Sequence, residues 1–534
     1  MRKKVISCLL VATMVAGAFG CMPVSAESTT EGTGDPTELS MFVDMSWFWY
    51  DKWGTDSISQ EITKKTGVSF DVTRSTGGDN LPLLIAGGDL PDVVYASAED
   101  HIAALCDPEV CWTYDELMEK YPDIDLGITD EERVYNETLS QDGKLYCVRN
   151  AMVPSDYEGD RLAGGGESYL IYRKDILDKL GLKEPTSMDE LEDVLLKVKE
   201  AYPDMVPLCW RDGYTDFFAT EMGHGAWWGI GYKNDDDKES GQMALWLDCD
   251  GTKDVYATIN RFAREGLLNA ETTTYDEQQT FELMMESGKG FACISSVTEG
   301  LVFQNAANEV GDTEQVWTIM TEPFAGYQKY YGLSGWAGYF ITKNCKDPEA
   351  ALRLYAYMRS DEGRRLGSWG IEGVDWKWDE NGHYAHTDEY EEFLANGGSN
   401  QLDKGIGVWI FGDQGEERTA VDLSRLKDRS ELTEGTGEYE TTLYTYAMLN
   451  YAKVIKAYPE ITFVVPNSGT DLKNKYDALM DAMASLEAKV EFAESEEDFE
   501  KAWTDMVDQA NAYGMQEINE YATQLVADYR ANNG

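Results

Sequence analysis

The chain has 534 residues, more than a single hydrophobic core usually supports, so we expect at least two lobes. Its 98 acidic residues against 45 lysines and arginines give a net charge of −53, which argues against nucleic acid as a partner because phosphate backbones are repelled. Hydrophobic residues make up 43% and aromatic residues 12% of the chain, enough for a large core and an aromatic-lined binding site as well.

The N-terminus carries an export signal. Arg2, Lys3 and Lys4 precede an apolar run over residues 5–20, which has the length of a signal-peptide core rather than of a membrane span. Two processing sites compete: residues 18–21 resemble a bacterial lipobox that would lipidate Cys21, and residues 24–26 suit ordinary signal peptidase. We therefore expect an exported protein, either lipid-anchored on the outer face of the cell membrane or secreted.

Strands and helices alternate from the start of the globular part. Residues 27–38 are almost free of apolar side chains and predict a flexible tether. After it the pattern predicts an α/β lobe with a mostly parallel sheet. Its predicted elements are a strand at 39–43, a helix at 56–66, a strand at 67–75, a helix at 79–86 that Gly87 and Gly88 end, and a strand at 93–95.

The same rhythm returns after residue 166. Thr186 or Ser187 is placed to cap a helix, with Glu190 in its first turn, and Asp347-Pro348 predicts another helix start. The predicted elements are a strand and helix over 167–182, helices over 184–203 and 252–268, a helix and strand over 278–296, a strand and helix over 335–376, and amphipathic helices over 471–532.

No catalytic or metal-binding motif stands out in the sequence. GxSxG, HExxH and Walker patterns are absent, and two Asp-rich stretches, 234–239 and 248–254, lack the full spacing of a calcium loop. We expect no enzyme activity, no cofactor and no metal, although a glycosidase or lyase with paired carboxylates stays open as an alternative. Cys106 and Cys111 are close enough in sequence to form a disulfide, which the sequence does not decide.

Tryptophans gather in separate glycine-flanked loops. They include Trp47 and Trp49 after the first strand, Trp227 and Trp228 in a Gly-rich loop, and Trp336 after Gly335. A flat indole suits the C–H face of a pyranose, and nearby carboxylates accept hydrogen bonds from hydroxyl groups. The pattern favours sugar binding, while nucleobases or peptides would also stack on such rings.

Five parts of the chain resemble the extracellular solute-binding proteins of family 1, in particular the long lipoproteins of Gram-positive bacteria. They are EITKKTGVSFDV at 61–72, LLIAGGDLPDVVY at 83–95, residues 170–199, residues 335–376 with GWAGYFITKN and GIEGVDW, and the C-terminal helical tail. Members of this family deliver solutes to ABC importers.

The resemblance implies an α/β fold of two lobes of the periplasmic-binding-protein type (type II), joined by crossover strands, with an added C-terminal helical region. The implied segments are a signal peptide at 1–26, a tether at 27–38, lobe 1 at 38–166, lobe 2 at 167–332, a return to lobe 1 at 333–375, and a return to lobe 2 with the C-terminal helices at 376–534.

The resemblance also implies a ligand site in a cleft between the lobes. It places the turn Asp89–Asp92 at the carboxyl side of the sheet, facing that cleft, and Trp336 at the second crossover. The implied ligand-binding residues are Trp47, Trp49, Asp89, Asp92, Trp336, Trp369 and Glu372. Trp227 and Trp228 match no family motif and are added as candidates from their loop alone.

The predicted function is that of a monomeric receptor that captures a neutral or mildly cationic solute, an oligosaccharide in the first place, and delivers it to an ABC-importer permease. Closure of the lobes around the ligand would need no covalent chemistry. A receptor for a peptide or another non-sugar solute is the second alternative, beside the glycosidase or lyase.

Overall fold

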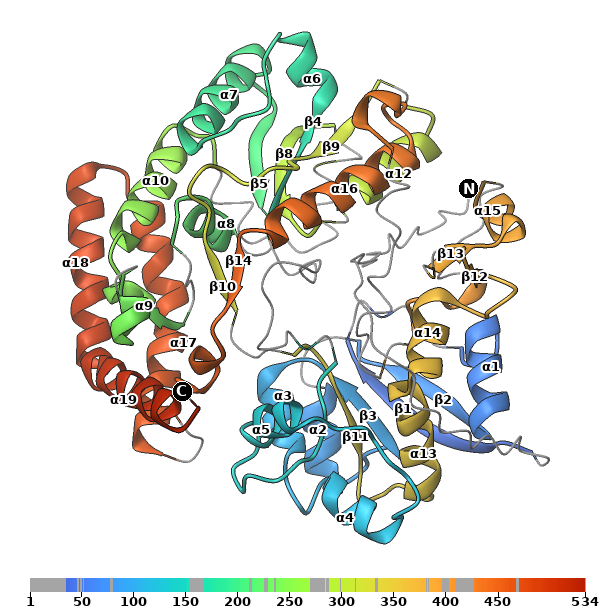
Figure 1. The fold of residues 1–534 in the computed structure, drawn as a ribbon. Helices are drawn as coiled ribbons and strands as arrows, with labels where there is room; N and C mark the ends of the chain where they lie inside the picture. Colours follow the sequence, from blue (N-terminus) through green and yellow to red (C-terminus); the bar gives the residue numbers. More distant parts are fainter. Residues whose placement is uncertain are drawn as a thin grey trace. The chain divides into compact units, whose positions relative to one another are not determined.

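The computed structural model describes residues 35–533 with internal gaps, and these residues divide into two compact lobes (Figure 1). The first lobe contains residues 35–152 and 335–411, and the second contains residues 168–331 and 427–533. The gaps are 46–47, 49, 51, 77–79, 151, 153–167, 211–213, 225–228, 235–236, 269–283, 285–287, 298, 313, 332–334, 381, 383, 396–402, 410, 412–426 and 467–469.

A four-stranded sheet forms the centre of the first lobe, in the order β11-β3-β1-β2. β1 runs parallel to β2 and β3, and β11 is antiparallel to β3. β3 is a short, fully buried apolar run, as expected for an inner strand covered on both faces. The strands are β1 (Thr37–Asp44), β2 (Val68–Arg74), β3 (Val93–Ala96) and β11 (Gly338–Ile341).

Helices and one hairpin surround this sheet. The Asp56 side chain caps α1 by accepting a hydrogen bond from the Ser59 N–H at 2.8 Å, and Gly67 ends α1 with φ +72°. The elements are α1 (Ser57–Thr66), α2 (Asn80–Gly87), α3 (Glu99–Leu105), α4 (Tyr114–Lys120), α5 (Asp130–Glu137), α13 (Pro348–Arg359), α14 (Asp361–Trp369), β12 (Trp376–Trp378), β13 (Tyr384–His386) and α15 (Asp388–Ala395).

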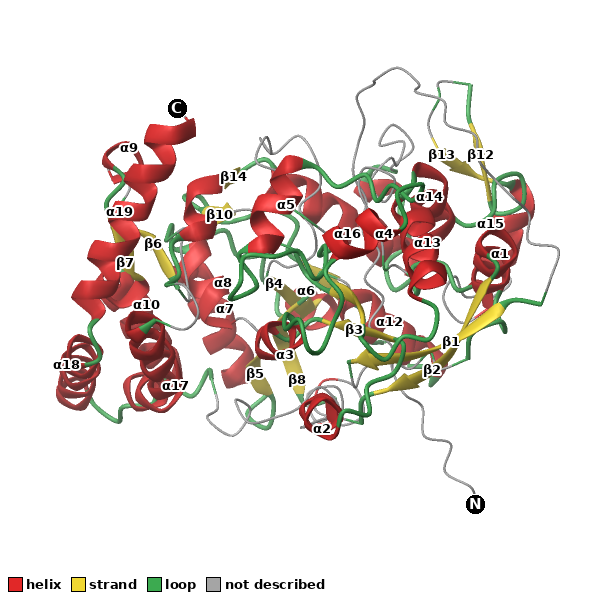
Figure 2. Ribbon diagram, turned by 90° about the horizontal axis from the view of Figure 1, so that it is seen from below, coloured by secondary structure: helices red, strands yellow, loops and turns green. Residues whose placement is uncertain are grey.

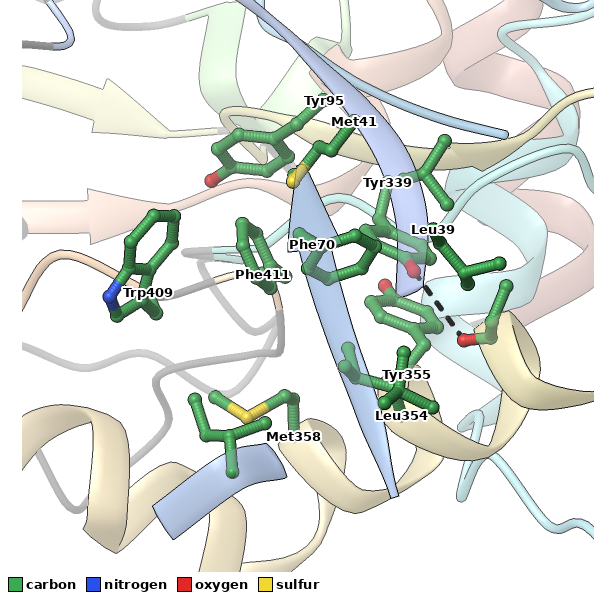
Figure 3. Close-up of a cluster of buried hydrophobic side chains, with 14 of the residues drawn as sticks. Leu39, Met41, Phe70, Tyr95, Tyr339, Leu354, Tyr355, Met358, Trp409 and Phe411 are labelled. Carbon is green, nitrogen blue, oxygen red and sulfur yellow. Dashed lines mark hydrogen bonds between the residues drawn. The ribbon is translucent and has the colours of Figure 1, made fainter. Parts of the chain in front are cut away.

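Aromatic side chains fill the core on one face of the sheet, as Figure 3 shows. Tyr339 of β11 stacks on Tyr355 of α13, with ring centroids 4.7 Å apart and planes at 4°. Trp409 and Phe411 are fully buried in the same core, and Phe411 lies 5.3 Å from the Tyr95 ring. The core therefore includes side chains, such as those of Trp409 and Phe411, that are far in sequence from the strands they pack against.

This packing corrects one predicted boundary. Residues 376–411, which the sequence analysis assigned to the second lobe, belong to the first in the part that the structure describes. Aromatic side chains from this range, Tyr390, Trp409 and Phe411, complete the core beside β1. Trp409 and Phe411 lie outside the helices and strands, so no periodicity in the sequence predicts that they return to the first lobe. Among the described residues, the first lobe extends to Phe411 and the second resumes at Lys427, rather than at residue 376.

The second lobe is built on another four-stranded sheet, in the order β5-β8-β4-β9. β5 and β8 are parallel, and β4 is antiparallel to both of its neighbours. Two small sheets, β6-β7 and β10-β14, accompany it. The strands are β4 (Tyr169–Arg173), β5 (Val206–Trp210), β6 (Ile230–Tyr232), β7 (Met243–Leu245), β8 (Gly290–Ser295), β9 (Trp317–Ile319), β10 (Lys329–Tyr331) and β14 (Ile455–Ala457).

The predicted cap of the helix over 184–203 is confirmed. Ser187 Oγ accepts a hydrogen bond from the Glu190 N–H at 3.2 Å, and Glu190 accepts one in return from Thr186. The helices of this lobe are α6 (Lys174–Lys179), α7 (Met188–Ala201), α8 (Tyr214–Glu221), α9 (Asp237–Ser240), α10 (Thr252–Arg264), α12 (Glu299–Glu309) and α16 (Gly437–Ala452), with 3₁₀ turns at Trp246–Asp248, Arg429–Glu431 and Pro459–Phe463.

Three long helices end the chain, as the sequence predicts: α17 (Asp471–Glu491), α18 (Glu496–Ala512) and α19 (Met515–Asn533). They pack with α10, β6 and β7 around a core of their own, and Figure 2 shows these elements together. Among the helices that the structure describes, none combines the length and the apolar composition needed to cross a membrane.

Candidate functional site

The carboxyl edge of the first-lobe sheet brings together segments that are distant in sequence. The parallel strands β1 and β3 end there, and β11 begins there, since Gly338 pairs with Ala96 and Ala96 with Asp44. In open α/β sheets this is the edge at which ligands bind. The side chains at this edge are therefore the first candidates for a binding site.

Trp336 presents its indole at this edge from a firmly held backbone. Its side chain is 36% exposed and packs edge-on against Tyr95, with ring centroids 6.2 Å apart and planes at 87°. The Trp336 N–H donates to the Asn150 carbonyl at 2.8 Å, and the Ala337 N–H donates to Asn150 Oδ1 at 3.0 Å. Asn150 in turn donates to the Tyr95 hydroxyl at 2.8 Å. A ring held in this way loses little freedom when a ligand stacks on it.

A buried arginine fixes a carboxylate at the same edge and contacts the backbone next to Trp336. Arg149 NH1 and NH2 donate to the two carboxylate oxygens of Glu99 at 2.8 and 2.5 Å, and NH1 also donates to the Gly335 carbonyl at 3.3 Å. The Arg149 side chain is 3% exposed, whereas the Glu99 side chain is 75% exposed. The arginine therefore orients a carboxylate that itself faces solvent.

Gly335 is needed for this close approach. A Cβ atom at residue 335 would lie 2.5 Å from Cβ of Arg149 and 2.9 Å from Sδ of Met152.

Burial alone would lower the pKa of Arg149, but the hydrogen bonds and the charge of Glu99 outweigh burial and leave that pKa raised. The guanidinium thus stays charged and holds Glu99 at any physiological pH.

A second polar pair ends β1. Nδ1 of His101, on α3, lies 2.5 Å from Oδ2 of Asp44. The Asp44 side chain is 3% exposed and that of His101 16% exposed. Burial raises the pKa of Asp44 even though the hydrogen bond and the charge of His101 oppose this. Because α3 also carries Glu99 in its first turn, one helix brings both polar pairs to the edge.

The turn with Asp89 and Asp92 lies at the amino edge, so the expected position at the carboxyl side of the sheet is wrong. Asp92 directly precedes β3 and is 5% exposed. Its carboxylate accepts hydrogen bonds from the Ser40 N–H and hydroxyl and from the Lys346 N–H, each at 2.7 Å. Burial raises the pKa of Asp92, but these bonds outweigh it and lower the pKa. Asp92 therefore joins β1 to the segment after β11, while Asp89 is exposed in the turn.

Trp369 and Glu372 lie in another part of the first lobe. Trp369 is 9% exposed and stacks on Tyr384 of the β12–β13 hairpin, with centroids 5.1 Å apart and planes at 14°. Glu372 is exposed and lines, with Trp376, a groove of about 440 Å³ beside α1 and α14. Trp369 thus serves the packing of the hairpin, and Glu372 belongs to this groove.

The remaining predicted positions have different outcomes. Trp47, Trp49, Trp227, Trp228 and the lipidation candidate Cys21 lie outside the described residues. Cys106 and Cys111 are both free and buried, so they form no disulfide in this structure. Within the described part of the chain, no group of three or more His, Cys, Asp or Glu side chains is placed to hold a metal ion.

A comparison with known families identifies the kind of protein that carries this edge. The family model for bacterial extracellular solute-binding proteins matches residues 52–365, more than half of the chain. The chain belongs to the bacterial extracellular solute-binding proteins. The resemblance found in the sequence is confirmed, and the family description agrees with the predicted export.

This solute-binding protein has relatives of similar length. It is 24% identical over 389 residues to the polygalacturonan/rhamnogalacturonan-binding protein YtcQ of Bacillus subtilis (strain 168), which covers 70% of this chain and 73% of YtcQ. It is 27% identical over 238 residues to the fructooligosaccharide ABC transporter substrate-binding protein FusA of Streptococcus pneumoniae serotype 4 (strain TIGR4), covering 41% and 42% of the two chains.

A solved structure confirms the predicted fold class. The alginate-binding protein AlgQ2 without calcium ion superposes with a TM-score of 0.61 at 18% identity, covering 93% of this chain and 99% of that chain. The solute-binding protein therefore has the two-lobed α/β fold of the periplasmic-binding-protein type.

Sequence reasoning missed the polar pairs that lie at the same sheet edge as Trp336. Glu99 and Arg149 are 50 positions apart, and Asp44 and His101 are 57 apart, so no local pattern joins them. One signal was present: Asp44 directly follows the strand predicted at 39–43, and the residue that follows a strand of a parallel sheet lies at the carboxyl edge.

Proposed function

We propose that this solute-binding protein is the receptor of an ABC importer, that it binds an oligosaccharide at the carboxyl edge of its first lobe, and that it delivers this ligand to a membrane permease. The observation that carries the proposal is the partly exposed indole of Trp336 at the same sheet edge as the solvent-facing carboxylate of Glu99, which Arg149 links to the carbonyl of the neighbouring Gly335. The names of YtcQ and FusA, which both refer to carbohydrate ligands, support it.

The chemistry of the edge suits a sugar. The indole of Trp336 offers an apolar face to the C–H groups of a pyranose, and Glu99 accepts hydrogen bonds from hydroxyl groups without needing to reorient. A dissociation constant of about 1 μM corresponds to roughly −8 kcal/mol. One stacked ring and a few hydrogen bonds to a charged acceptor, at about 1.5–3 kcal/mol each, reach that value before the cost of association.

Export and anchoring are further parts of the proposal. Residues 1–26 would direct export, Cys21 would carry the lipid, and residues 27–38 would tether a monomeric receptor at the outer face of the membrane. Mass spectrometry of the protein isolated from its own membrane tests this. A lipidated N-terminal peptide that begins at Cys21 agrees with the proposal, whereas an unmodified terminus at Glu27 would show secretion instead.

A binding screen with matched variants tests the function. The purified protein should show a thermal shift of several degrees with one or more oligosaccharides from a glycan panel. Trp336→Ala should abolish this shift, and Trp378→Ala should preserve it, because Trp378 is also exposed, at 46%, but lies on the β12–β13 hairpin. If Trp336→Ala responds like the parent, the site is wrong.

The same samples separate a receptor from an enzyme. The relatives YtcQ and FusA are named as binding proteins, and we propose that this chain also leaves its ligand unchanged. Chromatography of the glycan after incubation should return the starting material alone. Shorter or unsaturated products would establish the glycosidase or lyase alternative.

A further inference from the structure

The carboxylate of Glu99, and not the guanidinium of Arg149, is the charged group that a ligand meets beside Trp336. The Glu99 side chain is 75% exposed and the Arg149 side chain only 3% exposed. Arg149 NH1 and NH2 are already engaged by Glu99, by the Tyr135 hydroxyl at 3.1 Å and by the Gly335 carbonyl. Nε of Arg149 has no hydrogen-bond partner but is buried, so burial rather than a full set of partners keeps the guanidinium away from a ligand carboxylate.

Other charges at this edge point the same way. Asp100, next to Glu99 on α3, has a side chain that is 83% exposed, and Asp44 is held by His101. One exposed cation at the edge has the opposite sign: Arg74 ends β2, which β1 separates from β3, and its NH1 donates to the Phe48 carbonyl at 3.3 Å. The net charge of −53 adds a long-range field that repels anions.

From this arrangement we infer that Glu99 is a specificity-determining residue, and that it selects neutral oligosaccharides over oligosaccharides built of uronic acids. This inference rests on the proposed function. A hydroxyl group donates to the carboxylate, whereas a uronate placed on Trp336 would bring a like charge against it. The buried guanidinium of Arg149 offsets part of this repulsion, but the exposed carboxylate lies nearer to the ligand. With the like charges about 5 Å apart and the guanidinium a few ångströms farther away, the repulsion that remains lowers affinity about tenfold.

The inference separates this chain from two of its relatives by ligand chemistry. YtcQ is named for polygalacturonan and rhamnogalacturonan, and AlgQ2 for alginate, while FusA is named for fructooligosaccharides. At 24% and 18% identity, the ligands of YtcQ and AlgQ2 do not transfer to this chain. The charge that faces the ligand decides whether neutral or acidic oligosaccharides bind, and in this chain that charge is the negative carboxylate of Glu99.

The first experiment compares two ligand classes on the unmodified protein. Calorimetry or thermal shift is used to compare neutral oligosaccharides with oligogalacturonides and alginate oligomers of matched length. Neutral oligosaccharides should bind, about tenfold more tightly than any uronate. Raising NaCl from 20 to 500 mM should narrow this difference, because salt screens the repulsion.

The second experiment changes the charge. Glu99→Gln keeps the shape of the side chain but leaves the guanidinium of Arg149 uncompensated, so the preference for neutral over acidic glycans should fall about tenfold. The matched control is Glu109→Gln, which removes one exposed charge at the amino edge, near the Cys111–Thr342 bridge, and should leave the preference within about twofold. If Glu99→Gln does not fold, the ligand comparison and the salt series still decide.

The outcomes separate the inference from the function on which it rests. Tight binding of an oligogalacturonide or an alginate oligomer by the unmodified protein would overturn the role of Glu99 and leave a carbohydrate receptor standing. An unchanged preference in a folded Glu99→Gln variant would also overturn it. Failure to bind any glycan of either class would overturn the proposed function and the inference together.

Discussion

Glu221, at the end of α8 in the second lobe, is a buried acid whose ionisation should make the stability of the protein depend on pH. Its side chain accepts hydrogen bonds from the Tyr451 hydroxyl at 2.6 Å and from the Phe324 N–H at 2.7 Å. Burial raises the pKa of Glu221 from 4.5 to about 7, against the effect of these two bonds. Folding therefore favours the protonated acid.

The size and the sign of the effect follow from this difference in pKa. Between pH 4.5 and 7 the native state holds a proton at Glu221 that the unfolded state has released, so the free energy of unfolding falls as pH rises. Each pH unit in this window corresponds to about 1.4 kcal/mol. From pH 5.5 to pH 8.5 the loss that Glu221 causes amounts to about 2 kcal/mol.

Urea unfolding of the protein and of Glu221→Gln at pH 5.5, 7 and 8.5 measures this loss. The variant cannot ionise, so relative to the parent it should gain about 2 kcal/mol between the two extremes of pH. Glu322→Gln, an exposed acid that accepts a hydrogen bond from Asn450 nearby, is the control and should follow the parent. A constant difference between Glu221→Gln and the parent over the whole range would refute the reasoning.

Three substitutions in the first lobe test the remaining structural statements. Gly335→Ala should weaken glycan binding at least tenfold without unfolding the protein, because the new Cβ would displace Arg149 and with it Glu99. Binding calorimetry measures this change. An unchanged affinity would contradict the close approach of Gly335 to Arg149. Asn150→Ala removes the acceptor of the Ala337 N–H and a donor to Tyr95 and should lower the free energy of unfolding by about 2–4 kcal/mol in urea. Asp92→Asn should lower the free energy of unfolding by about 1–3 kcal/mol at pH 7, and this cost should shrink as pH falls through the lowered pKa of Asp92. Glycan binding by this variant should be unchanged at every pH. A loss of glycan binding with no loss of stability would instead place Asp92 in the ligand site.

Local features of the fold were predictable because their causes are local. The capping residues Ser187 and Asp347 fix helix starts within a few positions, and Gly88, with φ +71°, follows α2 where the sequence predicts its end. The long C-terminal helices follow from periodicity alone.

Features that depend on distant partners were not predictable. The family resemblance predicts the wrong edge for the turn at Asp92, because β3 runs parallel to β1 and therefore starts at the amino edge. The return of Trp409 to the first-lobe core needs a partner such as Asp56, 353 positions away, whose Oδ2 accepts the indole N–H at 3.2 Å. Of the candidate site, Trp336 was found by its residue type, and Glu99 and Arg149 were missed because only the fold brings them together.

The pairing of β11 with β3 has a consequence for how the protein reaches its native state. Val93 lies opposite Ile341, and the chain between them includes residues 168–331 of the second lobe. The first lobe is thus interrupted by a long insertion, and its sheet stays one strand short until β11 is in place. Until then β3 exposes an unpaired, apolar edge, so the partly folded chain is more prone to self-association than the native protein.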